Sequence, residues 1–262
     1  MTILKLGIPS KGRLMDLTID WFARQGIHIE TSSGSREYSA KILGNSNIQV
    51  MLISASEIPH ELAMGRIDLG VTGQDLVREK LPMWDEVLFE LKLLNFGKAN
   101  LVLAVPNFWV DVDSIDDFDA AAINFRRKNG FRLRIATKYH NLMWSYLRKM
   151  GVADYQFVDS QGATEGTIKN NSADAIADIA SSGKTLKANH LKVIGDKPVL
   201  SSQATLFLSY ASKWSPDKHE ILKNLNPNKK QMLELANLGF ITATDLADYL
   251  VKNYSFSFRK AY

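Results

Sequence analysis

Short apolar runs of strand length alternate with segments of helical period through about the first 200 residues. Leu14, Leu17 and Trp21, after the first run, recur at the spacing of one helix face. This alternation predicts an α/β fold in which helices cover mainly parallel sheets. The strand-like runs occupy residues 4–8, 50–53, 69–71, 100–105, 133–136, 155–158, 175–179 and 204–208.

Composition narrows the class of protein. The 262 residues are 45% hydrophobic and 23% charged, as in ordinary globular proteins. The absence of cysteine excludes disulfides, zinc–thiolate sites and a thiol nucleophile. We expect a cytoplasmic protein without a membrane segment, since no window is apolar enough to span a bilayer and no signal peptide is present.

The chain has two positions that resemble hinges, one at Pro106 and one at residues 195–202. They predict a body of two lobes, with the second lobe inserted in the first. Lobe I comprises residues 1–105 and 192–225, and lobe II comprises residues 106–191. Residues 226–262 predict a small helical extension at the C-terminus.

Polar or glycine-containing loops follow several of the predicted strands. Parallel α/β sheets bind ligands at the carboxyl ends of their strands, so these loops together predict a ligand cleft between the two lobes. The loops are residues 9–14, 70–76, 134–139, 161–166 and 181–185.

The most informative loop follows a buried strand that carries Asp174 and Asp178. Backbone N–H groups, hydroxyls and the flexible Gly183 suit a phosphate, and an acid at the strand end suits ribose hydroxyls or magnesium. Asp178 stands where a nucleotide-binding P-loop needs glycine, which excludes that class. An ordinary turn between strand and helix remains the alternative for this stretch taken alone.

A run of cations between residues 126 and 138 raises the question of nucleic acid, as does the net charge of +4. A solvated helix end explains the run equally well, because helix C-termini attract cations. No stacking pattern of aromatic residues accompanies it beyond Phe125 and Phe131. We therefore expect no nucleic-acid partner.

Taken together, the loops resemble ATP phosphoribosyltransferase over about residues 3–210. Each motif is weak by itself, but their joint order and spacing are specific. The motifs are Pro-Ser-Lys-Gly-Arg-Leu at 9–14, Asp-Leu-Gly-Val-Thr-Gly-Gln-Asp-Leu at 68–76, Ala-Thr-Lys-Tyr at 136–139, Gly-Ala-Thr-Glu at 162–165 and Asp-Ile-Ala-Ser-Ser-Gly-Lys-Thr-Leu-Lys-Ala-Asn at 178–189.

The resemblance implies a reaction and a fold. The family transfers the phosphoribosyl group of 5-phosphoribosyl-1-pyrophosphate to N1 of ATP, which gives N1-(5-phosphoribosyl)-ATP and pyrophosphate in the first step of histidine biosynthesis. Its fold has two lobes like a type II periplasmic binding protein, and Mg²⁺ is its cofactor. Because adenine N1 is already a nucleophile, catalysis should rest on positioning and on neutralising the leaving pyrophosphate.

The resemblance also implies roles for individual residues. The catalytic cations are Lys11, Arg13 and Arg36. The loop that holds the 5-phosphate contains Ser181, Ser182, Gly183, Lys184 and Thr185, and the ribose or magnesium contacts are Asp174 and Asp178, with the metal assigned to Asp178. The other substrate-binding residues are Asp75, Lys98, Thr137, Lys138, Tyr139, Thr164 and Glu165.

Two departures from the family pattern qualify the resemblance. Ser54 stands where many members have an arginine that would neutralise pyrophosphate, which leaves that charge to other cations such as Lys98. The tail is too short for the regulatory third domain of long members, so the chain resembles the short form. Short members imply a homodimeric catalytic core in a hetero-oligomer with a regulatory subunit that resembles histidyl-tRNA synthetase.

Three alternatives remain compatible with the sequence. One is a salvage phosphoribosyltransferase that uses another base, since its donor loop could be the same. Another is a solute-binding protein of the same architecture. The third is a catalytically silent regulatory paralogue, which Ser54 suggests because it replaces the arginine of many family members.

Overall fold

The computed structural model describes residues 2–31, 39–44, 46–160, 164–181 and 183–224. The chain forms two compact units. Unit 1 comprises the chain up to residue 77, residues 83–96 and the chain from residue 204 onward. Unit 2 takes residues 78–82 and 97–203.

Unit 1 is built on a seven-stranded sheet in the order β2-β3-β4-β1-β5-β13-β6. At its centre β1 runs parallel to β4 and β5, whereas β13 is antiparallel to β5 and β6. The strands β2, β3 and β4 pair antiparallel. The bounds are β1 (Leu4–Pro9), β2 (Ile29–Thr31), β3 (Ser39–Ile42), β4 (Ile48–Ile53), β5 (Leu69–Gly73), β6 (Leu88–Leu93) and β13 (Ala204–Ser209).

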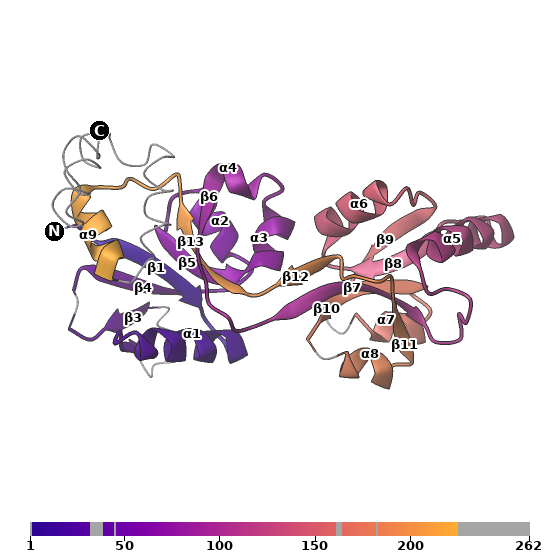
Figure 1. Ribbon diagram of the computed structural model, residues 1–262, viewed down its shortest axis with the longest axis horizontal. Helices are drawn as coiled ribbons and strands as arrows, with labels where there is room; N and C mark the ends of the chain where they lie inside the picture. Colours follow the sequence, from indigo (N-terminus) through magenta and orange to yellow (C-terminus); the bar gives the residue numbers. More distant parts are fainter. Residues whose placement is uncertain (1, 32–38, 45, 161–163, 182, 225–262) are drawn as a thin grey trace. The chain divides into compact units, whose positions relative to one another are not determined.

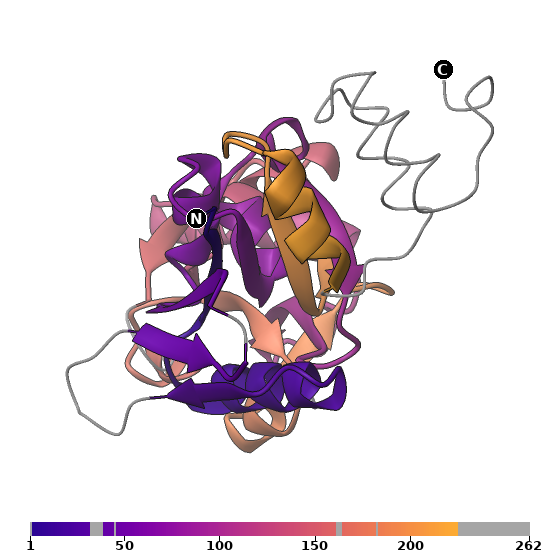
Figure 2. The same ribbon diagram turned by 90° about the vertical axis from the view of Figure 1, so that its left-hand side faces the viewer.

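Helices cover both faces of this sheet (Figures 1 and 2). On one face, Leu6 of β1 shares a buried cluster with Phe22 of α1 and Leu222 of α9. On the other face α2 lies so close to β5 that a Cβ on Gly70 would be 2.7 Å from Ile58, which explains the glycine. The helices with residues in unit 1 are α1 (Gly12–Arg24), α2 (Ile58–Ala63), α3 (Gln74–Lys80), α4 (Trp84–Val87) and α9 (Pro216–Asn224).

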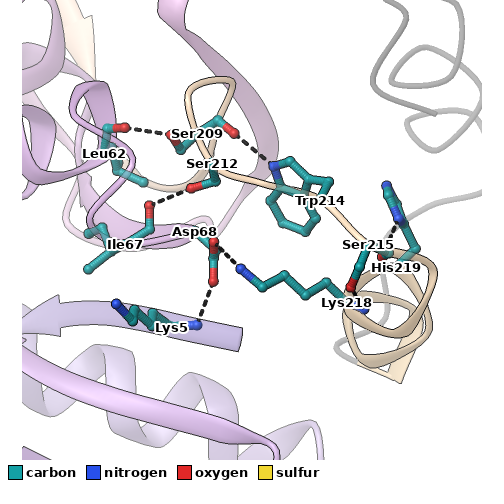
Figure 3. A network of polar contacts seen from close by, with 10 residues as sticks. All are labelled: Lys5, Leu62, Ile67, Asp68, Ser209, Ser212, Trp214, Ser215, Lys218 and His219. Atoms are coloured by element: carbon teal, nitrogen blue, oxygen red, sulfur yellow. Dashed lines mark hydrogen bonds and ion pairs between the residues drawn. The ribbon is translucent and has the colours of Figure 1, made fainter. Parts of the chain in front are cut away.

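A buried carboxylate anchors α9 to the sheet of unit 1 (Figure 3). Asp68, which precedes β5 and is 3% exposed, accepts a hydrogen bond from the backbone N–H of Lys5 at 2.7 Å. Its other oxygen lies 2.8 Å from Nζ of Lys218, on α9. Because a buried carboxylate needs such partners, the contact fixes α9 beside the start of β1.

Unit 2 is built on a six-stranded sheet in the order β11-β7-β10-β8-β9, with β12 also paired to β7. Here β8 runs parallel to β9 and β10, and β7 is antiparallel to β10, β11 and β12. The bounds are β7 (Ala99–Pro106), β8 (Leu133–Thr137), β9 (Tyr155–Asp159), β10 (Ala175–Ala180), β11 (Leu191–Ile194) and β12 (Leu200–Ser202).

Helices cover both faces of this sheet (Figure 1), and neighbouring residues of one strand pack against opposite layers. Leu103 of β7 packs in one cluster with Phe118 of α5 and Met143 of α6. Its neighbour Ala104 packs on the opposite face with Leu186 of α8. The sheet is therefore buried on both sides, as the uninterrupted apolar runs require. The helices are α5 (Ile115–Asn129), α6 (His140–Lys149), α7 (Gly166–Lys169) and α8 (Lys184–Ala188).

The predicted α/β class is confirmed, with two differences of detail. Both sheets are mixed rather than mainly parallel, because β7 and β13 run against their neighbours. Residues 97–105 and 192–203, assigned to lobe I from the sequence, lie in unit 2, since β11 and β12 pair with β7 and β7 pairs with β10. Residues 78–82, also assigned to lobe I, lie in unit 2 as well. The predicted extension at 226–262 lies outside the described residues, and a ligand cleft between the lobes stays a prediction.

In the part of the chain that the structure describes, no helix has the length and apolar character needed to cross a membrane.

Candidate functional site

Three parallel strands of unit 2 end at the same edge of their sheet. Thr137, the last residue of β8, pairs with Asp159 of β9 on one side and with Ala177 of β10 on the other. The predicted segments around residues 137–139, 164–165 and 178–185 therefore leave the sheet along one edge. The carboxyl edge of parallel strands is where α/β proteins bind ligands.

Asp178 and Lys138 are the charged pair at this edge. Oδ1 of Asp178 accepts a hydrogen bond from the N–H of Ile179 at 2.8 Å and lies 4.0 Å from Nζ of Lys138. No hydrogen bond from the described residues reaches the second oxygen, Oδ2. The Asp178 side chain is 19% exposed and that of Lys138 is 52% exposed. An anchored carboxylate with an open oxygen can accept hydroxyl groups or bind a cation.

The loop after β10 turns through Gly183 into α8. Gly183 has a φ of +66°, the left-handed region in which other residues are strained by about 1–2 kcal/mol. An added Cβ would meet nothing within 4 Å, so only the backbone conformation requires glycine. Ser181, Lys184 and Thr185, which are predicted to bind the 5-phosphate, are exposed, and Ser182 lies outside the described residues.

The turn that follows β8 is held by its own side chain. Thr137 is fully buried, and its Oγ1 accepts a hydrogen bond from the N–H of Tyr139 at 3.0 Å. Tyr139 is 7% exposed, which leaves Lys138 as the exposed residue of the three. Of this group, Lys138 is the side chain available to a ligand, and Thr137 acts on the shape of the turn.

Thr164 and Glu165 follow β9 at the same edge. The hydroxyls of Thr164 and Ser160 are 2.8 Å apart, and both residues are buried. Glu165 is half-buried and precedes α7. The described part of this segment therefore places Glu165 nearer to solvent than Thr164.

Asp174 directly precedes β10, so it lies toward the opposite end of the strand from Asp178. Four residues of strand separate them by about 13 Å. Both oxygens of Asp174 accept hydrogen bonds from the Arg134 guanidinium, at 3.0 and 2.9 Å. The hydrogen bonds to Asp174 raise the pKa of Arg134 above its usual value. Asp174 and Arg134 therefore form an ion pair near the starts of β10 and β8.

Lys98 lies at the candidate edge. It precedes β7, whose Asn100 pairs with Ala180 at the end of β10, and it is exposed. Since β7 runs antiparallel to β10, its first residues and the phosphate loop share this edge. The register therefore agrees with Lys98 as a ligand-facing cation.

The remaining predicted residues belong to unit 1. Lys11 and Arg13 are exposed around the start of α1, and Asp75 is half-buried in the first turn of α3. Both positions follow parallel strands, β1 and β5. Arg36 lies outside the described residues.

The structure adds a contact that the sequence did not suggest. Nε2 of His140, the first residue of α6, lies 3.3 Å from Oδ1 of Asp159 at the end of β9. The pair joins the ends of neighbouring strands, so only the register of the sheet reveals it. Among the described residues, no three or more His, Cys, Asp or Glu side chains gather into a metal site.

Comparisons with known proteins identify the family of the chain. The chain matches the family model described as ATP phosphoribosyltransferase over residues 54–227. A curated ATP phosphoribosyltransferase of Cereibacter sphaeroides is 58% identical over 212 residues, which cover 81% of this chain and 90% of that protein. The enzyme of the same name from Mesorhizobium japonicum is 44% identical over 217 residues, 82% of this chain and 94% of that protein.

A solved structure shares the fold. The ATP phosphoribosyl transferase (HisG:HisZ) complex from Thermotoga maritima contains a chain that superposes with a TM-score of 0.64 at 22% identity. The superposition covers 88% of this chain and 97% of that chain. From the family match and its close curated relatives, the chain belongs to the ATP phosphoribosyltransferase family.

Proposed function

We propose that the chain transfers the phosphoribosyl group of 5-phosphoribosyl-1-pyrophosphate to N1 of ATP, the first step of histidine biosynthesis. The bond between ribose C1 and the pyrophosphate oxygen breaks, and a bond between C1 and adenine N1 forms. The observation that carries the proposal is the edge of unit 2 where Asp178 and Lys138 lie beside a hydroxyl-rich loop. This edge combines donors for a phosphate with an acceptor for ribose.

In this proposal the loop at 181–185 holds the 5-phosphate of the donor. Gly183 turns the backbone in the left-handed conformation, and the exposed Thr185 and Lys184 supply a hydroxyl and a cation. Asp178 accepts hydrogen bonds from the ribose hydroxyls through its open oxygen. An anchored carboxylate loses little orientational freedom on binding, which favours a fixed sugar position.

Neutralisation of the pyrophosphate is assigned to cations. As the pyrophosphate leaves, C1 becomes oxocarbenium-like and negative charge grows on the departing oxygens. Lys11, Arg13 and Lys98 are exposed cations that follow or precede strands of the two sheets. Arg36 keeps its predicted role, and nothing in the described residues bears on it.

The side chains present suit Mg²⁺ held partly by substrate. Mg²⁺ commonly binds one or two protein carboxylates together with substrate phosphates, so a single open carboxylate oxygen on Asp178 suffices. When bound, the ion neutralises phosphate charge. Asp178 would hold it, and Asp174 would not, because Arg134 occupies both oxygens of Asp174.

The activity test uses purified chain with ATP, 5-phosphoribosyl-1-pyrophosphate and Mg²⁺. The expected result is an ultraviolet absorbance change from the N1-substituted product, with one pyrophosphate released per product. Adenine and other free bases in place of ATP test the salvage alternative. No product, with or without a regulatory subunit, would overturn the proposal in favour of a silent paralogue or a binding protein.

Removal of one hydroxyl tests the phosphate loop. Thr185→Val keeps the shape of the side chain, and a hydrogen bond to a charged group contributes about 1.5–3 kcal/mol. We expect the dissociation constant of 5-phosphoribosyl-1-pyrophosphate to rise about tenfold or more, measured by calorimetry, with ATP affinity unchanged. The matched control is Thr31→Val, at an exposed threonine of β2 in unit 1. Unchanged donor affinity in Thr185→Val would count against the loop assignment.

The proposal includes assembly with a regulatory subunit. The Thermotoga maritima neighbour is a complex of HisG with HisZ, and this chain shares the fold of its matched chain. We infer a homodimeric core that joins such a hetero-oligomer.

A further inference from the structure

The helix that follows the site turn, α6, begins without a cap of its own. Its N-cap residue is Tyr139, which makes no capping hydrogen bond through its side chain. The first N–H groups of a helix have no partner within the helix and must be satisfied from elsewhere. In α6 this partner comes from a residue 62 positions earlier in the chain.

Glu79 supplies the missing acceptors. Its Oε1 accepts the N–H of Asn141 at 3.1 Å, and its Oε2 accepts the N–H of Leu142 at 3.0 Å. In return, Nδ2 of Asn141 donates to the backbone oxygen of Glu79 at 2.8 Å. A carboxylate at the positive end of a helix is further stabilised by the helix dipole.

Glu79 is the buried member of this clamp, Asn141 is exposed, and the clamp residues belong to unit 2. Glu79 is 6% exposed, and its segment, residues 78–82, belongs to unit 2 although the flanking stretches of sequence belong to unit 1. Three hydrogen bonds in two directions fix both the position and the rotation of the first turn of α6. A solvent-exposed cap would restrict the first turn of α6 less.

This first turn directly follows the candidate site. The backbone oxygen of Tyr139 accepts the N–H of Met143 at 3.0 Å, and the N–H of Tyr139 donates to Thr137. The turn is therefore held at one end by β8 and at the other by the clamped helix. Lys138 lies between these two anchors, 4.0 Å from Asp178. A displaced helix start would move Lys138 relative to Asp178.

We propose that Glu79 is a positioning residue for the phosphoribosyl donor, acting through the first turn of α6 on Lys138. The inference rests on the proposed function, because it assigns the donor to the edge that Lys138 and Asp178 form. Glu79 touches no reacting atom. A cap with a purely structural role would change stability alone, whereas a positioning residue also changes donor affinity.

The test is Glu79→Gln, which preserves shape but turns an amide donor toward a helix N–H. We expect the KM for 5-phosphoribosyl-1-pyrophosphate to rise at least about tenfold, with kcat within about threefold and the KM for ATP within about twofold. A rise in KM at constant kcat indicates lost binding that ground and transition states share. The amides of Asn141 and Leu142 should exchange hydrogen faster than in the wild type.

Two further variants make the result decisive. Asp116→Asn removes an exposed acid from the first turn of α5 in the same unit and should leave both KM values unchanged. Glu79→Asp keeps the carboxylate on a shorter side chain and should give an intermediate donor KM. It also serves if Glu79→Gln does not fold.

The outcomes separate this inference from the proposed function. If the wild type forms no product, the proposed function fails, and donor binding measured by calorimetry then decides the inference. If the wild type is active and the Glu79 variants bind the donor as the wild type does, the inference is overturned, even where amide exchange or unfolding temperature has changed.

Discussion

Asp174, directly before β10, and Asp178, within β10, have different surroundings. Asp174 has both oxygens bonded to Arg134 and a side chain 13% exposed, whereas only one oxygen of Asp178 accepts a hydrogen bond from the residues that the structure describes. Both were predicted from the same short stretch, where nothing in the spacing distinguishes them. The partner of Asp174 lies 40 residues earlier in the chain.

Matched substitutions at the residue scale should separate the two roles. Asp174→Asn should lower the free energy of unfolding by about 2 kcal/mol, because hydrogen bonds between charged groups are lost, and leave donor affinity unchanged. Asp178→Asn should change stability by less than about 1 kcal/mol, since its ion pair is long and the Lys138 partner is half exposed. The affinity of the Asp178→Asn variant for 5-phosphoribosyl-1-pyrophosphate in the presence of Mg²⁺ should fall about tenfold or more. Urea unfolding and calorimetry measure the two quantities, and the reverse pattern would restore Asp174 to the ligand site.

At the scale of elements, α5 shows how local sequence fixes a helix start. Ser114 Oγ accepts the N–H of Asp117 at 3.1 Å, and Oδ2 of Asp117 accepts the N–H of Ser114 at 2.9 Å. The hydrogen bonds from the Ser114 hydroxyl and backbone lower the pKa of Asp117 below its usual 3.8. This reciprocal pair of hydrogen bonds is a capping box. The similar spacing of Ser54 and Glu57 predicts a capping box before α2 as well, but there the N-cap is Glu57, whose side chain makes no capping hydrogen bond.

The capping box of Ser114 and Asp117 predicts a stability that depends on pH. A carboxyl whose pKa is lowered in the folded state stabilises the fold above its unfolded pKa, and that contribution disappears as the pH falls through the folded value. Ser114→Ala should therefore raise the pKa of Asp117 toward 3.8 and destabilise the protein at pH 7 more than at pH 3. NMR titration and unfolding at the two pH values test this, with Ser145→Ala on the exposed side of α6 as control. An equal loss at both pH values would contradict it.

The anchoring of α9 gives another prediction at this scale. The Lys218 side chain is 15% exposed and that of Asp68 is 4% exposed, so the ion pair is largely shielded from water. Lys218→Met leaves the buried carboxylate without its cation and should lower the free energy of unfolding by about 3 kcal/mol. Lys213→Met, at an exposed lysine just before α9, should have little effect. Equal losses in the two variants would mean that the ion pair contributes little.

Sequence periodicity predicted the strands with long apolar runs and missed β2, β3, β6, β11 and β12. Each predicted run lies within an observed strand, because strands buried on both faces are continuously apolar. None of the predicted runs covers these five strands. These strands form by pairing with a neighbour already in place, which the local pattern does not encode.

At the scale of the whole molecule, the prediction concerns assembly. One chain has a mass of 29.4 kDa, and we expect a homodimer of twice that mass in size-exclusion chromatography with light scattering. Addition of a regulatory subunit that resembles histidyl-tRNA synthetase should shift the dimer to a larger species and raise its activity. A monomer that stays monomeric and equally active with the subunit would contradict the proposed assembly.

The sequence alone determined the α/β class, the strands with long apolar runs, the family and the loops that follow parallel strands, since each depends on residues close together in the chain. Tertiary structure decided where the two units divide, because β7, β11 and β12 pair across long sequence separations. It also decided that Asp174 pairs with Arg134, and that Glu79 holds the start of α6. These facts depend on strand register and on contacts between distant segments, which come into being only when the chain folds.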